Sequence, residues 1–305
     1  MRTRGVNTRL GSDTTHTKHP VPTVIGMQLS TFLRMKSFLP SRFSLLLLVL
    51  AIGLSACSGS GRLRYETPKE AYEQGLQKFE SGDYQKATEY LQGVFDFGRT
   101  HQWASDAQLL LARAYRANEE YLLAANEYTR FTQIYRSDPR IPDAEYELAM
   151  TYYDRSPMYR LDQTDTERAI VQFRLFIERY ASNPLVQDAQ DRITELRSKL
   201  ARKQIHTAGL YERREYFNAA AVSYEAAFDK YYDTEYADDA LLGATKAYFE
   251  LARGGVRELQ AERLDLAESN YDRLIQIFPD SPLIKEAEAV YTEMQALRAS
   301  LGISS

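Results

Sequence analysis

Residues 107–135 read AQLLLARAYRANEEYLLAANEYTRFTQIY, and their spacing of apolar residues predicts the fold. In the second half of this stretch, Ala124, Tyr128, Phe131 and Tyr135 follow one another at spacings of four, three and four. Residues at these spacings lie on one face of a helix, so they predict a helix with a single apolar stripe. The small alanine lets a second helix approach closely, and the aromatic side chains fill the space beside it. The stretch therefore predicts a pair of packed helices.

The same pattern recurs five times along the chain. An alanine, here called the marker alanine of its unit, precedes a bulky residue by four positions in Ala87/Leu91, Ala124/Tyr128, Ala169/Phe173, Ala220/Tyr224 and Ala267/Tyr271. An acidic residue followed by alanine recurs as Asp106-Ala107, Asp143-Ala144, Asp188-Ala189, Asp239-Ala240 and Glu286-Ala287. Each acidic residue lies 19 positions after its marker alanine. Five equal offsets predict an all-α repeat array whose units share a block of fixed length.

The units differ in length outside this block, since successive marker alanines are 37, 45, 51 and 47 residues apart. In units two and four a tyrosine precedes the marker alanine by nine residues. The distance is 17 in unit three (Tyr152 to Ala169) and 19 in unit five (Tyr248 to Ala267). We therefore expect eight extra residues in the turn of unit three and ten in the turn of unit five, where the longer turn covers Gly254 to Glu262.

Unit four carries its extra 14 residues between Asp188 and Tyr211. This stretch has no proline and is rich in Leu, Arg, Lys, Gln and Glu, which favour helix. Fourteen residues are close to four turns at about 3.6 residues per turn, so a lengthened helix keeps its apolar face in register. The spacing predicts one long helix from about Leu185 to Arg214, which joins units three and four.

The N-terminal region contains an export signal. Lys36 and Arg42 precede an apolar run from Phe43 to Leu54, and small residues follow it. The run is shorter than the roughly 20 residues that a membrane-spanning helix needs. Leu54, Ser55, Ala56 and Cys57 resemble the lipobox of bacterial lipoproteins, in which the cysteine receives a diacylglycerol, the signal is removed and the new amine is acylated, for example with palmitate. Cys57 is the only cysteine, so it forms no internal disulfide.

These features divide the chain into four parts. We expect residues 1–34 to be an upstream extension from a misassigned start at Met1 rather than Met35, and 35–56 to be the lipoprotein signal peptide. Residues 57–66 are then the lipidated cysteine and a tether, and 67–305 the repeat array. After residue 57 the chain has 31 Lys and Arg against 41 Asp and Glu, a net charge of −10. Such an acidic chain argues against nucleic acid as a partner.

The first two complete motifs resemble the tetratricopeptide pattern. Leu111-Ala112-x-x-Tyr115 precedes Ala124-x-x-x-Tyr128, and Leu148-Ala149-x-x-Tyr152 precedes Ala169-x-x-x-Phe173 in the same way. The resemblance implies a tetratricopeptide-repeat solenoid of about five helix pairs, starting near Thr67-Pro68. A single unit cannot bury its apolar stripe alone, so stacking supplies the core and leaves one concave surface.

The whole chain resembles the BamD family, the tetratricopeptide-repeat lipoproteins of the outer-membrane β-barrel assembly machinery. The lipobox and five long repeats carry the resemblance, together with Phe97-Gly98, the insert from Asp154 to Thr166 and the long helix. It implies a lipid-anchored protein on the periplasmic face of the outer membrane that takes part in the assembly and insertion of β-barrel proteins. Implied partners are the barrel subunit BamA, other lipoproteins of the machinery and unfolded outer-membrane proteins. The first repeats would receive substrate and the last would hold the machinery.

We expect the partner-binding groove to use aromatic and arginine side chains, which are enriched at binding hot spots. Its expected residues are Tyr72, Phe79, Phe97, Arg113, Arg116, Tyr146 and Tyr153. We hypothesise that Arg113 and Arg116 bind a carboxylate, such as the C-terminus of an unfolded barrel protein. The alternative is that these side chains are solvated or packed against a neighbouring unit.

No motif for catalysis, metal or cofactor binding stands out. His101 and His206 are far apart and have no third ligand at metal spacing, so we expect each to be solvated or packed. No phosphate-binding loop follows a predicted strand. We therefore expect a scaffold rather than an enzyme. The alternative function is a tetratricopeptide lipoprotein that scaffolds peptidoglycan or cell-division enzymes.

Overall fold

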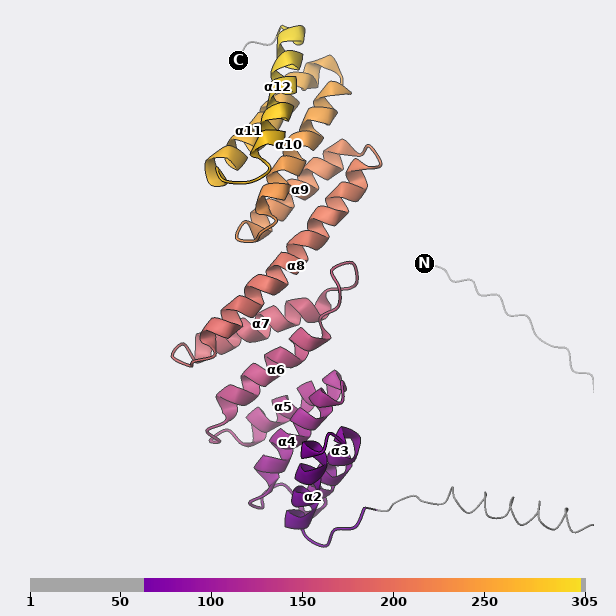
Figure 1. The fold of residues 1–305 in the computed structure, drawn as a ribbon, viewed down its shortest axis with the longest axis vertical. Helices are drawn as coiled ribbons and strands as arrows, with labels where there is room; N and C mark the ends of the chain where they lie inside the picture. The colour runs from indigo at the N-terminus through magenta and orange to yellow at the C-terminus, as the bar shows by residue number, and fades with distance from the viewer. Residues whose placement is uncertain (1–62, 303–305) are drawn as a thin grey trace, which may run out of the picture. The chain divides into compact units, whose positions relative to one another are not determined.

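A computed structural model describes residues 63–302, which lie in one compact unit and contain helices but no strand (Figure 1). Its helices are α2 (Pro68–Glu80), α3 (Tyr84–Gly93), the short 3₁₀ helix η1 (Val94–Phe97), α4 (Ala104–Ala117), α5 (Tyr121–Ile134), α6 (Ile141–Arg155), α7 (Thr164–Arg179), α8 (Val186–Glu212), α9 (Phe217–Tyr231), α10 (Ala237–Arg253), α11 (Arg257–Ile277) and α12 (Ile284–Leu301). The all-α fold class is therefore confirmed.

Consecutive helices form antiparallel pairs that follow one another in chain order (Figure 1). The pairs α2/α3, α4/α5, α6/α7, α8/α9 and α10/α11 each contain one marker alanine, and α12 packs on α10 and α11. Most of the contacts join helices that are adjacent in the sequence, as expected for a solenoid in which each unit contacts its neighbours.

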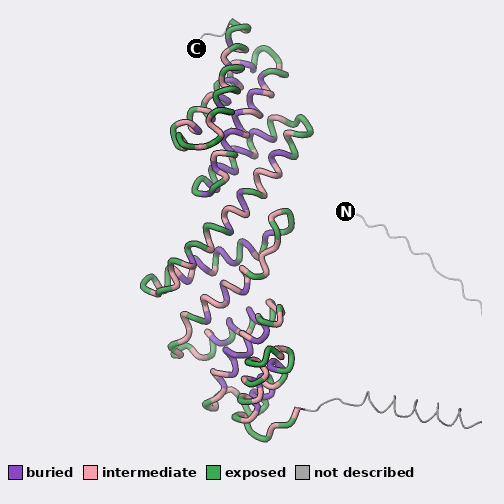
Figure 2. Tube along the Cα trace, in the orientation of Figure 1, coloured by how far each residue is buried: buried purple, intermediate pink, exposed green. Residues whose placement is uncertain are grey.

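Close contacts between helices explain why the distance from marker alanine to acidic residue is the same in all five units. All ten alanines of the two patterns are at most 1% exposed: Ala87, Ala107, Ala124, Ala144, Ala169, Ala189, Ala220, Ala240, Ala267 and Ala287. Beside them, Leu91, Tyr128 and Phe173 are fully buried, and buried positions alternate with exposed ones along the helices (Figure 2). A larger side chain at the alanine positions would push two helices apart, because protein interiors are packed without spare volume.

The short turns also share one backbone conformation. Gly82, Glu119 and Glu215 each lie five residues before a marker alanine and have φ of 78°, 61° and 62°. This left-handed conformation suits glycine and is unfavourable for glutamate. Its recurrence gives the turns of units one, two and four the same local geometry.

Unit three has its extra residues in the turn, as the spacing predicts. Helix α6 ends at Arg155 and α7 begins at Thr164, so residues 156–163 form the insert loop. The buried side-chain amide of Gln163 donates to the carbonyl oxygens of Met158 and Leu161, at 3.0 Å each. The loop therefore has internal hydrogen bonds that fix its shape.

The prediction for unit five is wrong. Its turn consists only of residues 254–256, because α11 begins at Arg257, within the stretch we expected to be loop. The ten extra residues lengthen α10 and α11 instead. Residues 257–266 contain no glycine or proline, and Gln260 and Leu264 extend the buried face of α11 back from Ala267. A continuous helix therefore buries more surface here than a loop would.

Helix α8 contains 27 residues and contacts two parts of the core. Ala189, Leu196 and Leu200 belong to the hydrophobic cluster of unit three, which also contains Phe173. Ala208, near the end of the helix, belongs to a cluster formed by units four and five. The helix therefore connects the two clusters as one continuous element.

Within residues 63–302, no helix has both the length and the apolar character needed to span a bilayer. The expected signal peptide, the residues Leu54, Ser55 and Ala56, and Cys57 lie outside the described residues. Their processing and lipidation stay predictions.

Replacing a marker alanine with leucine should destabilise the fold. Ala220→Leu adds volume where α9 is fully buried, and overpacking of this kind costs typically about 1–3 kcal/mol. Ala226→Leu on the same helix is the matched control, because Ala226 is exposed. Urea unfolding followed by circular dichroism measures both variants. Equal stabilities of the two variants would contradict the close-approach role of the marker alanine.

Candidate partner-binding groove

Three of the expected groove residues, Phe79, Arg113 and Arg116, lie together around one cavity. The cavity measures about 420 Å³, and its lining residues are Phe79, Arg113, Arg116, Ala117, Tyr128, Glu147 and Asp154. Except for Tyr128 on α5, they come from α2, α4 and α6, the first helices of units one to three. The stacking of the first three units therefore builds this site.

Arg113 forms a two-pronged ion pair with Glu147. Its Nε lies 2.8 Å from Oε2, and its Nη2 lies 2.6 Å from Oε1. The buried Tyr128 hydroxyl donates to the same carboxylate at 2.7 Å. The hydrogen bond to Glu147 raises the pKa of Arg113, and burial together with the Glu147 charge raises the pKa of Tyr128. Arg113 stays charged and Tyr128 stays protonated at physiological pH.

Arg116 pairs with Asp154 on the same helix as Glu147. The Nε of Arg116 lies 2.6 Å from Oδ2 of Asp154, and both side chains are 27% exposed. Burial lowers the pKa of Arg116, but the hydrogen bond to Asp154 and the neighbouring negative charges together outweigh it, so the pKa is raised. A carboxylate ligand at this site would therefore compete with Glu147 and Asp154, which already neutralise the two arginines.

Tyr72 and Phe97 do not line this cavity. The half-buried ring of Tyr72 stacks on Trp103, with centroids 5.4 Å apart and planes inclined by 30°. Phe97 ends η1, is 43% exposed and meets the ring of Tyr65 edge-on at 6.2 Å. Tyr72 thus contributes to packing between units one and two, while Phe97 leaves much of its ring accessible.

Tyr146 and Tyr153 lie on α6 and bind α8. The Tyr146 hydroxyl donates to Asp188, and burial, followed by this hydrogen bond, raises the pKa of Tyr146 to about 12. The Tyr153 hydroxyl donates to Glu195 at 2.6 Å, and Arg192 lies over its ring at 4.9 Å. Both tyrosines are packed against the neighbouring unit, in the way that the alternative interpretation describes.

The sequence reasoning missed the carboxylates that bind the arginines. Glu147 lies 34 residues after Arg113, and Asp154 lies 38 residues after Arg116. These separations are close to the 37-residue interval between the first marker alanines, so residues one unit apart meet across neighbouring helices. The pair Arg140–Asp106 has the same separation of 34. A search for opposite charges one unit apart would have found these residues.

The two histidines of this part of the chain serve local packing. His101 contacts the carbonyl oxygen of Val94 and the backbone N–H of Trp103, both at 3.2 Å. The ring of His206 meets Tyr159 edge-on. Between residues 63 and 302, no three His, Cys, Asp or Glu side chains lie close enough together to hold a metal ion.

Comparison with known proteins identifies relatives over most of this region. The chain is 28% identical to the outer membrane protein assembly factor BamD of Vibrio cholerae over 219 residues, which are 67% of this chain and 89% of that protein. It is 24% identical to BamD of Caulobacter vibrioides over 208 residues, covering 67% and 68%. Identity to BamD of Pasteurella multocida is 24% over 233 residues, covering 73% and 88%.

A solved structure and a family model also match. The TPR2AB-domain:pHSP90-complex of yeast Sti1 superposes with a TM-score of 0.37 at 14% identity, covering 75% of this chain and 98% of that one. The model of the YfiO family, described as outer membrane lipoprotein, matches residues 64–264, from before α2 into α11. Because this match spans most of the chain, the protein belongs to the YfiO family of outer membrane lipoproteins, which bears out its resemblance to BamD.

Proposed function

We propose that this protein is a periplasm-facing, lipid-anchored scaffold that takes part in the assembly and insertion of β-barrel proteins of the outer membrane. The observation that carries the proposal is the family match over residues 64–264, together with relatives from three organisms that are named outer membrane protein assembly factor BamD. A helical repeat array suits this role because its stacked units present an extended surface for other proteins.

The proposed partners are a BamA-like barrel subunit, other lipoproteins of the assembly machinery and unfolded outer-membrane proteins. The cavity of the first three units supports substrate binding, since it combines Phe79 with Arg113 and Arg116. Aromatic and arginine side chains provide much of the binding energy at protein interfaces. The proposed division of labour assigns substrate to these units and the machinery to units four and five.

The proposed activity is binding rather than catalysis. In the cavity lined by Phe79, Arg113 and Arg116, both arginines are paired with carboxylates and Tyr128 stays protonated, so these groups suit ligand binding better than proton transfer. Two or three acyl chains on Cys57 would anchor the scaffold stably, since each buried methylene contributes roughly 0.8 kcal/mol.

Purification of the full-length lipoprotein from outer membranes in mild detergent tests the proposed partners. We expect a stoichiometric β-barrel protein with several periplasmic domains to co-purify, identified by mass spectrometry. Peptidoglycan or cell-division enzymes in its place would contradict the assembly role and favour the alternative scaffold.

Replacing Cys57 tests the anchor. Cys57→Ala should abolish acylation and, with it, removal of the signal peptide before residue 57, so the variant should keep the apolar run from Phe43 to Leu54 in place of the acyl chains. Fractionation, immunoblotting and mass spectrometry of the N-terminal peptide measure the outcome. Wild-type protein without acyl chains at Cys57 would refute the lipoprotein assignment.

Paired variants test whether Arg113 and Arg116 receive a carboxylate. Arg113→Glu with Arg116→Glu should weaken binding of a C-terminal barrel-protein peptide by about tenfold or more, since charge-assisted hydrogen bonds contribute roughly 1.5–3 kcal/mol. Glu147→Gln with Asp154→Asn should strengthen binding, because it removes the competing carboxylates. Fluorescence anisotropy measures both.

The control replaces two exposed arginines outside the cavity, Arg136→Glu with Arg174→Glu, which should leave binding unchanged. If the Glu147/Asp154 variant binds no more tightly than the parent and the Arg113/Arg116 variant binds equally well, the arginines are only a structural contact between units two and three.

A further inference from the structure

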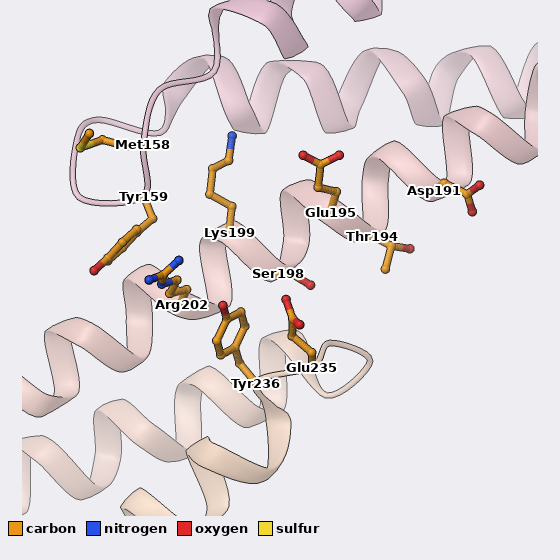
Figure 3. A pocket seen from close by; sticks show the side chains of 10 residues that line it. All are labelled: Met158, Tyr159, Asp191, Thr194, Glu195, Ser198, Lys199, Arg202, Glu235 and Tyr236. Carbon is orange, nitrogen blue, oxygen red and sulfur yellow. The ribbon is translucent and has the colours of Figure 1, made fainter.

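A second cavity, of about 710 Å³, lies over the middle of α8 (Figure 3). Its lining residues are Met158, Tyr159, Asp191, Thr194, Glu195, Ser198, Lys199, Arg202, Glu235 and Tyr236. Helix α8 forms the floor, the insert loop 156–163 supplies one wall, and the turn between α9 and α10 supplies the other (Figure 3). The volume lies within the range of about 300–1,000 Å³ that is usual for ligand sites.

Two departures from the repeat meet at this cavity. The insert loop exists because unit three has eight extra residues, and the middle of α8 exists because unit four has 14. Neither addition interrupts the fixed block between marker alanine and acidic residue. Residues that were added outside the fixed block and that border one cavity point to a binding role.

The wall formed by the insert loop is held in place. Besides its internal hydrogen bonds, it is bound by two lysines of α8: Lys199 donates to Oγ of Ser156 at 2.9 Å, and Lys203 donates to the carbonyl oxygen of Leu161. Met158 is nonetheless 66% exposed. The loop therefore offers an apolar side chain from a fixed backbone, which lowers the entropy cost of binding.

Charges are separated along the floor of the cavity. Asp191, Glu195, Lys199 and Arg202 follow at spacings of four, four and three, so they lie along one face of α8 (Figure 3). Within the described residues, neither Lys199 nor Arg202 has a carboxylate within ion-pair distance, whereas Glu195 accepts from Tyr153 and lies 3.6 Å from Arg192. Burial lowers the pKa of Lys199, so its charge lacks full compensation.

The cationic end of the cavity also carries aromatic rings. Arg202 lies over the ring of Tyr159 at 4.5 Å, and Tyr236 lies on the other side of α8 from this loop in Figure 3. Arginine stacked on a ring keeps its N–H edge available for a carboxylate. This arrangement differs from that in the cavity around Arg113 and Arg116, where Glu147 and Asp154 already bind both arginines.

We infer that the α8 cavity binds an extended peptide segment of a partner protein that carries a carboxylate beside an aromatic or aliphatic side chain. The carboxylate binds Lys199 and Arg202, and the apolar side chain packs against Met158 and the tyrosine rings. Glu195 and Glu235 accept hydrogen bonds from the peptide backbone. Three carboxylates in the lining oppose a multiply charged anion such as phosphate. This site goes beyond the assembly role and does not depend on it.

Methyl NMR of the full-length lipoprotein in detergent micelles tests the inference, with ¹³C-methyl-methionine as the label. Met158 lies in the cavity, and Met294 is fully buried in the core as an internal control. The titrants are acetyl-Gly-Tyr-Phe-Asp-amide, its Asn counterpart, acetyl-Gly-Tyr-Phe with a free C-terminus, the amide of that peptide, and inorganic phosphate. We expect saturable shifts of the Met158 signal, assigned with Met158→Leu, for the acidic peptides only.

Comparison of the two acidic peptides distinguishes a side-chain carboxylate from a C-terminal one. Arg202→Glu should weaken binding of the tighter peptide by about tenfold or more, as expected for loss of a charge-assisted hydrogen bond. Arg214→Gln with Lys285→Gln should have no effect, because both side chains are exposed and lie outside the cavity. Ser156→Ala removes the contact of Lys199 with the loop but keeps the charge, so it should retain binding.

The inference would be overturned if no acidic peptide gave a saturable Met158 shift, or if the acid and the amide bound equally well. Displacement of the peptide by phosphate at equal concentration would also overturn it. Loss of binding in Ser156→Ala but not in Arg202→Glu would likewise show that Lys199 only fixes the loop. None of these results bears on co-purification with the barrel subunit, so the assembly role is tested separately.

Discussion

Close approach of neighbouring helices at alanine is the constraint on which the structure depends. Ala87, Ala124, Ala169, Ala220 and Ala267 are fully buried, and each lies 19 residues before an acidic residue in the first turn of the next unit. Helices that touch at a methyl group tolerate neither extra volume nor a change of register. The block between these positions therefore has one length, and all variation between units occurs outside it.

Variation outside the block produces the surface that distinguishes this chain from a uniform repeat. The lengthened α8 and the loop 156–163 both line the α8 cavity. In the first three units, opposite charges one unit apart line the cavity around Phe79, Arg113 and Arg116. The buried block thus maintains the fold, while residues free of that constraint carry charges and rings that recognise other proteins.

The sequence predicts those properties that follow from periodicity. The marker alanines predict the helix pairs and their buried faces, and the interval from Tyr152 to Ala169 locates the insert loop. The same argument fails for unit five, because a count of residues does not say whether they form a loop or extend a helix. There the deciding interaction is the burial of Gln260 and Leu264.

The candidate site is predicted less completely. Phe79, Arg113 and Arg116 do lie together, but the roles of Glu147 and Asp154 depend on how one unit stacks on the next. Tyr146 and Tyr153 bind α8 for the same reason, since the stacking of unit four on unit three brings Asp188 and Glu195 within reach. Contacts between units depend on how the units stack on one another. The spacing of residues within one unit does not determine that stacking.

Depletion of this protein in its own host is the most direct test of its role in outer-membrane protein assembly. The measurement is the amount of folded β-barrel proteins in the outer membrane, detected by their heat-dependent mobility in gels. We expect folded barrels to decline before growth stops and unfolded precursors to accumulate in the periplasm. Unchanged barrel levels, accompanied by defects in cell division or peptidoglycan, would contradict that role.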